Sequence, residues 1–261
     1  MRPLYVEFVG LPGVGKSTIC GEVRLRLEAR GIRYGVQASM GNRVVGPAGP
    51  FDVLGRRWRH RAWFDKFASY IVLHLKYWKL SLSTYKLILR RATAAREIWR
   101  RSRRVLLQLH RIRNATNLVT AGYSDLVLFD QGVVAPLREL VAAGEITTPE
   151  QLQPLVIKVL KPVQDCRILI IFLSADVESI VERLANRNRN LGPYDRMNSD
   201  QAQTALRRQS MYQLLLMEQI RRFSPPARIF QADMSWTIDS LADAIATMIV
   251  SYQDDPSTSE T

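Results

Sequence analysis

The chain has 261 residues, of which 47% are apolar and 23% charged, a composition typical of a globular protein large enough to bury a core. Its longest aliphatic run, residues 168–173, is too short to span a bilayer, and no charged leader precedes the first apolar segment, so we expect a cytoplasmic protein without a secretory signal. The formal net charge of +13 favours anionic ligands.

The positive charge is concentrated in one segment. Residues 40–115 contain 18 Lys and Arg against 3 Asp and Glu, together with Trp58, Trp63, Trp78 and Trp99. A field of this sign attracts phosphorylated substrates, nucleic acid or anionic lipid. The two cysteines, in contrast, both lie in apolar surroundings, and we interpret them as reduced core residues.

The first half of the chain begins with a strand and a helix. Residues 4–9 are an apolar run that ends in glycine, which is typical of a buried strand, and residues 16–29 have apolar side chains at every fourth position, which predicts a helix. A second strand is predicted at 33–38. Residues 40–55 are rich in Gly and Pro and indicate a loop, and residues 56–113 are predicted to form two or three helices.

The second half alternates strands and helices. Strands are predicted at residues 125–130, 167–173 and 228–231. Helices are predicted at residues 133–143, 149–160, 176–187, 199–222 and 238–250. This alternation predicts an α/β three-layer sandwich with about five parallel strands, helices on both faces and a helical insertion. We expect one domain over 1–251 and a disordered acidic tail at 252–261.

A glycine-rich motif follows the first predicted strand and opens the first predicted helix. Its spacing, two glycines around four residues and then Lys-Ser, matches a phosphate-binding loop (Walker A). Glycines let several backbone N–H groups turn toward a polyphosphate, the lysine reaches the outer phosphates, and the serine hydroxyl binds Mg²⁺. The expected nucleotide-binding residues are Gly10, Pro12, Gly13, Val14, Gly15, Lys16, Ser17 and Thr18. ATP and Mg²⁺ are therefore the expected cofactors.

An acidic residue, Asp130, closes the strand predicted at 125–130. Ligands of parallel sheets bind beyond the carboxyl ends of the strands, so Gly10, Asp130 and Ala175 should gather at one edge. There a carboxylate can hold the Mg²⁺ shell or accept the proton of an attacking hydroxyl. The alternative is a helix N-cap.

Three arginines follow the fourth strand: Arg183, Arg187 and Arg189. On a helix, positions 183 and 187 share one face, and residues 186–198 are predicted to form a mobile lid loop. Guanidinium groups that close over a transferring phosphoryl group stabilise its charge and exclude water. The alternative is a solvated basic face. For segment 40–115, the readings left open are a substrate-binding insertion, a plain helical cover, a nucleic-acid contact and an anionic membrane contact.

In this order the motifs resemble the P-loop nucleoside and nucleotide kinases, especially the thymidylate kinase-like and deoxynucleoside kinase group. The resemblance implies that Arg183 lies near the adenine, that Arg187 and Arg189 clamp phosphates, and that the loop around Asp233 borders the adenine. The sequence departs from the group in two places. Gln131 stands where the group usually has arginine, and residues 36–39 lack the acid often found after the second strand.

We therefore expect an ATP-dependent kinase acting on a small-molecule phosphate acceptor. A polynucleotide 5′-end kinase or nucleic-acid-stimulated ATPase is the first alternative, and a nucleotide-dependent switch is the second. Lys16, Asp130, Arg187 and Arg189 are the expected catalytic residues, and Ser17 and Asp130 the expected metal ligands. A homodimer is compatible with the sequence.

Overall fold

The structure, a computed structural model of the whole chain, describes the residues around the sheet. The described residues are 3–37, 119, 122, 124–135, 137–138, 148–160, 163, 166–186, 194, 197–223 and 227–254. All of segment 40–115 and most of the predicted lid loop lie outside them. The predictions made for those two segments therefore stay predictions.

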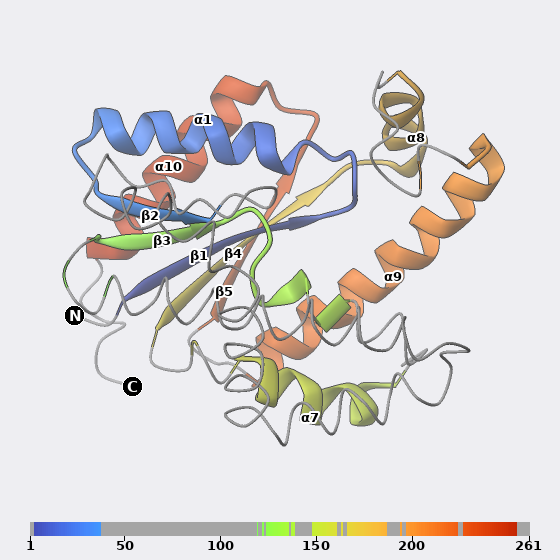
Figure 1. Cartoon of the computed structure of the whole chain (residues 1–261), viewed down its shortest axis with the longest axis horizontal. Helices are drawn as coiled ribbons and strands as arrows, with labels where there is room; N and C mark the ends of the chain where they lie inside the picture. The colour runs from blue at the N-terminus through green and yellow to red at the C-terminus, as the bar shows by residue number, and fades with distance from the viewer. Residues whose placement is uncertain are drawn as a thin grey trace, which may run out of the picture.

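Five parallel strands form one sheet in the order β2-β3-β1-β4-β5 (Figure 1). The strands are β1 Leu4–Gly10, β2 Tyr34–Gln37, β3 Leu126–Phe129, β4 Arg167–Ser174 and β5 Ala227–Asp233. All residues of β1 and β3, and all of β4 except its last, are buried. Strands covered on both faces are apolar at most positions, which explains the apolar runs of the sequence; Glu7 in β1 and Arg167 in β4 are buried charged exceptions.

Helices cover both faces of this sheet. Their bounds are α1 Lys16–Ala29, α7 Pro149–Leu160, α8 Val177–Ala185, α9 Ser199–Phe223 and α10 Ile238–Asp254. In Figure 1, α1 and α10 lie on one face, and α7 and α9 lie on the other. Alternate residues of β1 accordingly enter two separate cores, since Val6 packs with α1 and α10 and Val9 packs with α7 and α9. With the phosphate loop between β1 and α1, this is the α/β P-loop NTPase fold, as predicted.

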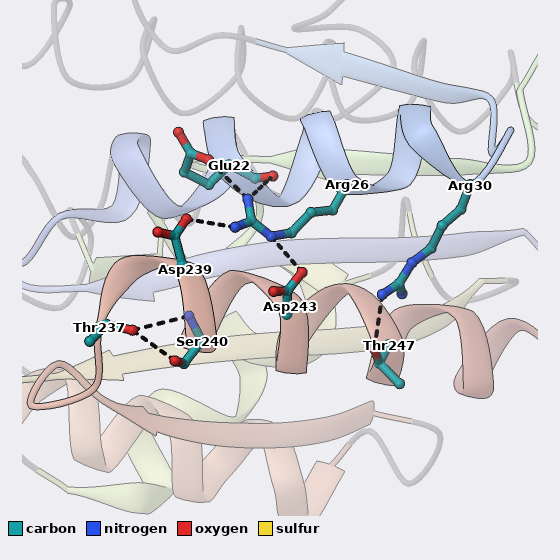
Figure 2. A network of polar contacts seen from close by, with 8 residues as sticks. All are labelled: Glu22, Arg26, Arg30, Thr237, Asp239, Ser240, Asp243 and Thr247. Carbon is teal, nitrogen blue, oxygen red and sulfur yellow. Dashed lines mark hydrogen bonds and ion pairs between the residues drawn. The ribbon is translucent and has the colours of Figure 1, made fainter.

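A polar network joins α1 to α10 (Figure 2). Arg26 forms ion pairs of 2.9 Å with Glu22, 2.7 Å with Asp239 and 2.7 Å with Asp243. One turn further on, Arg30, the C-cap residue directly after α1, donates a hydrogen bond of 3.1 Å to Thr247. The network lies outside the apolar contact between the two helices, so it fixes how α10 lies on the helix that follows the phosphate loop.

The last helix is longer than predicted. It continues to Asp254, and Tyr252 is buried, so the prediction of a disordered tail from 252 is wrong for residues 252–254. Arg167, at the start of β4, donates to the carbonyls of Tyr252 at 2.8 Å and Gln253 at 3.0 Å. A cation at a helix C-terminus satisfies its last carbonyls and favours its dipole, and this extends the helix.

Two other predicted boundaries change. Helix α8 begins after Asp176, whose carboxylate caps it by accepting from the Ser179 N–H, and ends at Ala185 with Asn186 as its C-cap. Arg187 lies outside the described residues, so the expectation that Arg183 and Arg187 share a helical face stays a prediction. Strand β5 extends to Asp233, two residues beyond its predicted end, because it pairs with β4 as far as Ser174.

None of the described helices is both long enough and apolar enough to cross a membrane.

Candidate functional site

The carboxyl ends of four strands meet at one edge of the sheet. Gly10 at the end of β1 pairs with Leu173, and Ser174 at the end of β4 pairs with Asp233. Asp130 directly follows Phe129, the last residue of β3, which pairs with β1. The expectation that Gly10, Asp130 and the end of β4 gather at one edge is therefore confirmed.

Glycines give the loop between β1 and α1 its shape. Gly13 and Gly15 have φ angles of 91° and 100°, in the left-handed region that residues with a Cβ rarely adopt. At Gly10, a Cβ would lie 2.6 Å from the Leu173 carbonyl oxygen, so β4 requires a glycine there. Gly15 also caps α1, which has no side-chain cap and no acid in its first turn. A helix N-terminus of this kind favours an anion.

Two neighbouring segments hold the loop. A Cβ on Gly13 would lie 3.1 Å from Ile180 and 3.2 Å from Leu184, so α8 packs directly on the loop. On Gly15 a Cβ would lie 3.2 Å from the Met234 side chain, which follows β5. Val14 is fully buried. Side chains from α8 and from the β5–α10 connection therefore fix the loop from outside.

Lys16 lies back over this loop. Its Nζ donates hydrogen bonds of 3.0 Å to the Gly10 carbonyl and 2.8 Å to the Leu11 carbonyl. The side chain thus spans the turn from the first residue of the helix to the last residue of β1. An ammonium held here is close to the position where the loop amides would meet a polyphosphate.

Ser17 and Asp130 are in direct contact. The Ser17 hydroxyl donates a hydrogen bond of 2.8 Å to Asp130 Oδ2, although the two residues are 113 positions apart. Asp130 is only 8% exposed, whereas Ser17 is exposed. A hydroxyl and a carboxylate are hard oxygen ligands of the kind that Mg²⁺ takes, usually one or two from the protein with phosphates supplying others. The pair therefore fits the predicted magnesium site.

A buried acid fixes the segment that follows Asp130. Glu7 on β1 accepts backbone N–H bonds from Gly132 at 2.8 Å and Val134 at 3.0 Å, and the Tyr5 hydroxyl donates to it at 2.9 Å. Tyr5 in turn accepts the N–H of Val133 at 2.8 Å. A Cβ on Gly132 would overlap the Tyr5 hydroxyl. Burial raises the pKa of Glu7 to about 7, although these donors oppose the shift.

The sequence analysis did not single out this network. The one available signal was an acid inside an apolar strand. Nothing in the sequence indicates that its partners are backbone N–H groups about 125 positions away.

The cysteine beside this edge is not a reactive thiol. Cys20 on α1 is buried, and burial, with a smaller contribution from the Asp130 carboxylate, raises the pKa of its thiol to about 12. Cys166 is also buried, and neither cysteine forms a disulfide. The interpretation of both as core residues is confirmed.

The other predicted site residues fall into three groups. Arg183 lies exposed on α8, the helix that packs on Gly13. Asp233 is exposed at the end of β5, where its carboxylate accepts the Ser235 N–H at 3.0 Å and stabilises the turn. Arg187 and Arg189 lie outside the described residues. The structure thus brings Lys16, Ser17 and Asp130 together.

Comparison with known proteins adds a structural neighbour. No family model matches the chain, and no curated protein matches it by sequence. Among solved structures, a deoxyadenosine kinase from M. mycoides with the products dCMP and dCDP bound matches with a TM-score of 0.46 and 13% sequence identity, over 95% of this chain and 99% of that one. The fold assignment rests on this chain's own sheet order and phosphate loop.

Proposed function

We propose that this protein is an ATP-dependent small-molecule kinase that transfers the γ-phosphoryl group to a nucleoside, a nucleotide or a similar metabolite. The hydrogen bond between Ser17 and Asp130 carries the proposal, because it joins the two metal-type ligands at the mouth of a glycine loop. A loop that bound phosphate for storage or structure would not need a carboxylate beside it, since a carboxylate repels phosphate unless a cation lies between them.

In this proposal each residue has a separate task. The backbone of the loop and the N-terminus of α1 bind the phosphates, and Lys16 leaves the carbonyls of Gly10 and Leu11 to neutralise the outer ones. Ser17 and Asp130 would hold Mg²⁺, which supplies positive charge that offsets the charge of the phosphates. Catalysis by such a site is mainly positioning and charge stabilisation.

Further parts of the proposal come from the sequence and its family resemblance. Arg187 and Arg189 close over the transferred group, Arg183 and the turn at Asp233 border the adenine, and segment 40–115 covers the acceptor. Asp130 is also the candidate general base, because the Glu7 carboxylate is fully occupied by donors and is only 1% exposed.

The test is a screen of nucleosides, nucleotides, sugars and antibiotics with γ-labelled ATP, using wild type and Lys16→Ala. We expect label to move to one acceptor class with wild type only. Transfer to polynucleotide 5′ ends, with a steep fall of binding at higher salt, would favour the first alternative. Hydrolysis with no labelled acceptor would favour a nucleotide-dependent switch. Equal transfer by Lys16→Ala would refute a role for the loop.

A further inference from the structure

A glutamine from a distant helix contacts the first residue of the phosphate loop. Gln213, in the middle of α9, is only 1% exposed, and its Nε2 donates a hydrogen bond of 3.0 Å to the Gly10 carbonyl. The nitrogen must face this carbonyl, because a carbonyl oxygen can only accept. Neighbouring α9 residues Leu216, Met217 and Ile220 belong to the core beneath β1 and β4. The amide is therefore presented by a firmly packed helix.

The Gly10 carbonyl has two donors of different character. Lys16 Nζ and Gln213 Nε2 each lie 3.0 Å from it. Lys16 is positively charged and is attracted by phosphate. When its ammonium group moves to an outer phosphate, its hydrogen bond to the Gly10 carbonyl breaks. Gln213 is neutral and buried, so phosphate draws it far less. After Lys16 leaves, Gln213 would keep this buried carbonyl hydrogen-bonded.

The same pair of helices holds the loop at a second point. α8 packs on Gly13 through Ile180 and Leu184. Glu178 on α8 accepts hydrogen bonds from two α9 side chains, Gln203 at 2.8 Å and Arg207 at 2.7 Å. One helix pair therefore contacts the loop at Gly13 by apolar packing and at Gly10 by a hydrogen bond.

Resting on the proposed ATP binding, we propose that Gln213 is a positioning residue of the phosphate loop. It holds the Gly10 carbonyl in place while Lys16 exchanges that carbonyl for phosphate oxygens, so that the loop keeps its shape in the nucleotide complex. Without Gln213, the movement of Lys16 leaves a buried carbonyl unsatisfied, and this cost opposes nucleotide binding.

The test compares two buried amides of the same helix in the full-length protein. Gln213→Met removes the donor at nearly constant volume. The matched control is Gln219→Met, because Gln219 is equally buried and neither of its amide atoms has a hydrogen-bond partner among the residues the structure describes. Binding of Mg·ATP is measured by titration calorimetry, and thermal unfolding is measured without nucleotide.

We expect the Kd for Mg·ATP to rise about tenfold in Gln213→Met and to stay within about twofold of wild type in Gln219→Met. The melting temperature without nucleotide should differ little between the two variants, since Lys16 still donates to Gly10 there. A wild-type Kd in Gln213→Met, or an equal loss in both variants, would overturn the proposal, because the second result means a general loosening of α9.

A second variant keeps the proposal testable if Gln213→Met does not fold. Gln213→Asn keeps the amide but is one methylene shorter, so it should not reach Gly10, and we expect the same weakening. The readout that a purely structural role would not produce is a higher KM for ATP with unchanged KM for the acceptor. If wild type itself binds no Mg·ATP, the proposed function fails, whereas tight wild-type binding with unaffected variants refutes the role of Gln213 alone.

Discussion

The two edges of the parallel sheet carry similar polar side chains but use them differently. At the amino edge, Arg33 and Asp125 pair with each other at 2.8 Å and are joined by further bonds to the backbone. At the carboxyl edge, Lys16 rests on loop carbonyls, and Asp130 accepts from the Ser17 hydroxyl. Cation and acid satisfy each other at the first edge, whereas at the second each of them bonds to uncharged groups.

This difference has a physical meaning. The pairing at the amino edge holds the pKa of Asp125 below its usual range through the Arg33 hydrogen bonds, and both oxygens of the Asp125 carboxylate are bonded to Arg33. Lys16 donates to two backbone carbonyls and Asp130 accepts from a hydroxyl, and these uncharged groups can be exchanged for a phosphate or a cation. A charged residue near a strand end thus indicates a site when its partners are neutral and exchangeable, and a structural tie when its partner is the opposite charge.

The largest expected effect comes from Lys16. Lys16→Ala should lower kcat/KM by about 1,000-fold or more, since it removes the charge aimed at the transferring group, and should leave the fold intact. The control is Arg33→Ala, which removes a cation from the opposite edge. Steady-state kinetics and circular dichroism are the measurements. A comparable loss in both variants would contradict the distinction between the edges.

Asp130→Asn should lower kcat/KM by roughly 10²–10³-fold. The amide keeps the size of the side chain but loses the charge that would hold Mg²⁺. We also expect the Mg²⁺ concentration for half-maximal rate to rise. Asp125→Asn, five residues earlier and just before the same strand, is the matched control and should keep wild-type kinetics. Unchanged Mg²⁺ dependence in Asp130→Asn would count against the metal site.

Glu7→Gln should change how stability depends on pH. Burial raises the pKa of Glu7 from 4.5 to about 7, so the folded protein keeps a proton that the unfolded chain releases between these values. The contribution of Glu7 is therefore full below about pH 4.5 and is lost as pH rises through about 7. The shift corresponds to about 3 kcal/mol at most.

Urea unfolding of wild type and Glu7→Gln at several pH values measures this effect. The wild-type advantage over the variant in free energy of unfolding should shrink as pH rises from about 4.5 to above 7. A difference that grows with pH would mean that the carboxylate, stabilised by the N–H donors of Gly132 and Val134, is the favoured form throughout.

The smallest effect is expected at the amino edge. Arg167→Met should lower the free energy of unfolding by about 2 kcal/mol, since hydrogen bonds from a charged donor to the last carbonyls of α10 are lost. The Kd for Mg·ATP should not change, because Arg167 bonds to the C-terminal end of α10, at the sheet edge opposite the loop. Urea unfolding and calorimetry measure the two quantities. If the Arg167→Met variant is fully folded but binds the nucleotide more weakly than wild type, the two edges are coupled.

The sequence allowed prediction of features that depend on neighbours along the chain. The glycine spacing from Gly10 to Gly15 reflects local backbone geometry, and the apolar runs of β1 and β4 reflect burial on both faces. Asp130 could be placed beside the loop because parallel strands end at a common edge. These inferences needed only short-range patterns and one topological rule.

Features that depend on distant partners were missed. In the sequence, Glu7 is an acid in an apolar strand with no visible partner. Its partners are backbone N–H groups after Asp130, which only the fold brings next to it. In the sequence, Gln213 is an ordinary helical residue. Its contact with Gly10 exists only because the fold packs α9 beneath β1. The end of α10 was misplaced because the cation that extends it, Arg167, belongs to a strand 85 positions away from Tyr252. In each case a contact across the fold decided the outcome.

The two buried cysteines offer a way to watch each edge separately. Cys20 lies in α1 next to Asp130, whereas Cys166 directly precedes Arg167 at the opposite edge. Both side chains are shielded in the folded protein, so an alkylating reagent modifies either one only during a transient local opening. The alkylation rates of the two thiols would therefore time the opening of the two edges independently, in unmodified protein. If a nucleotide slows the alkylation of Cys20 and leaves that of Cys166 unchanged, then nucleotide binding reduces local opening at the carboxyl edge only.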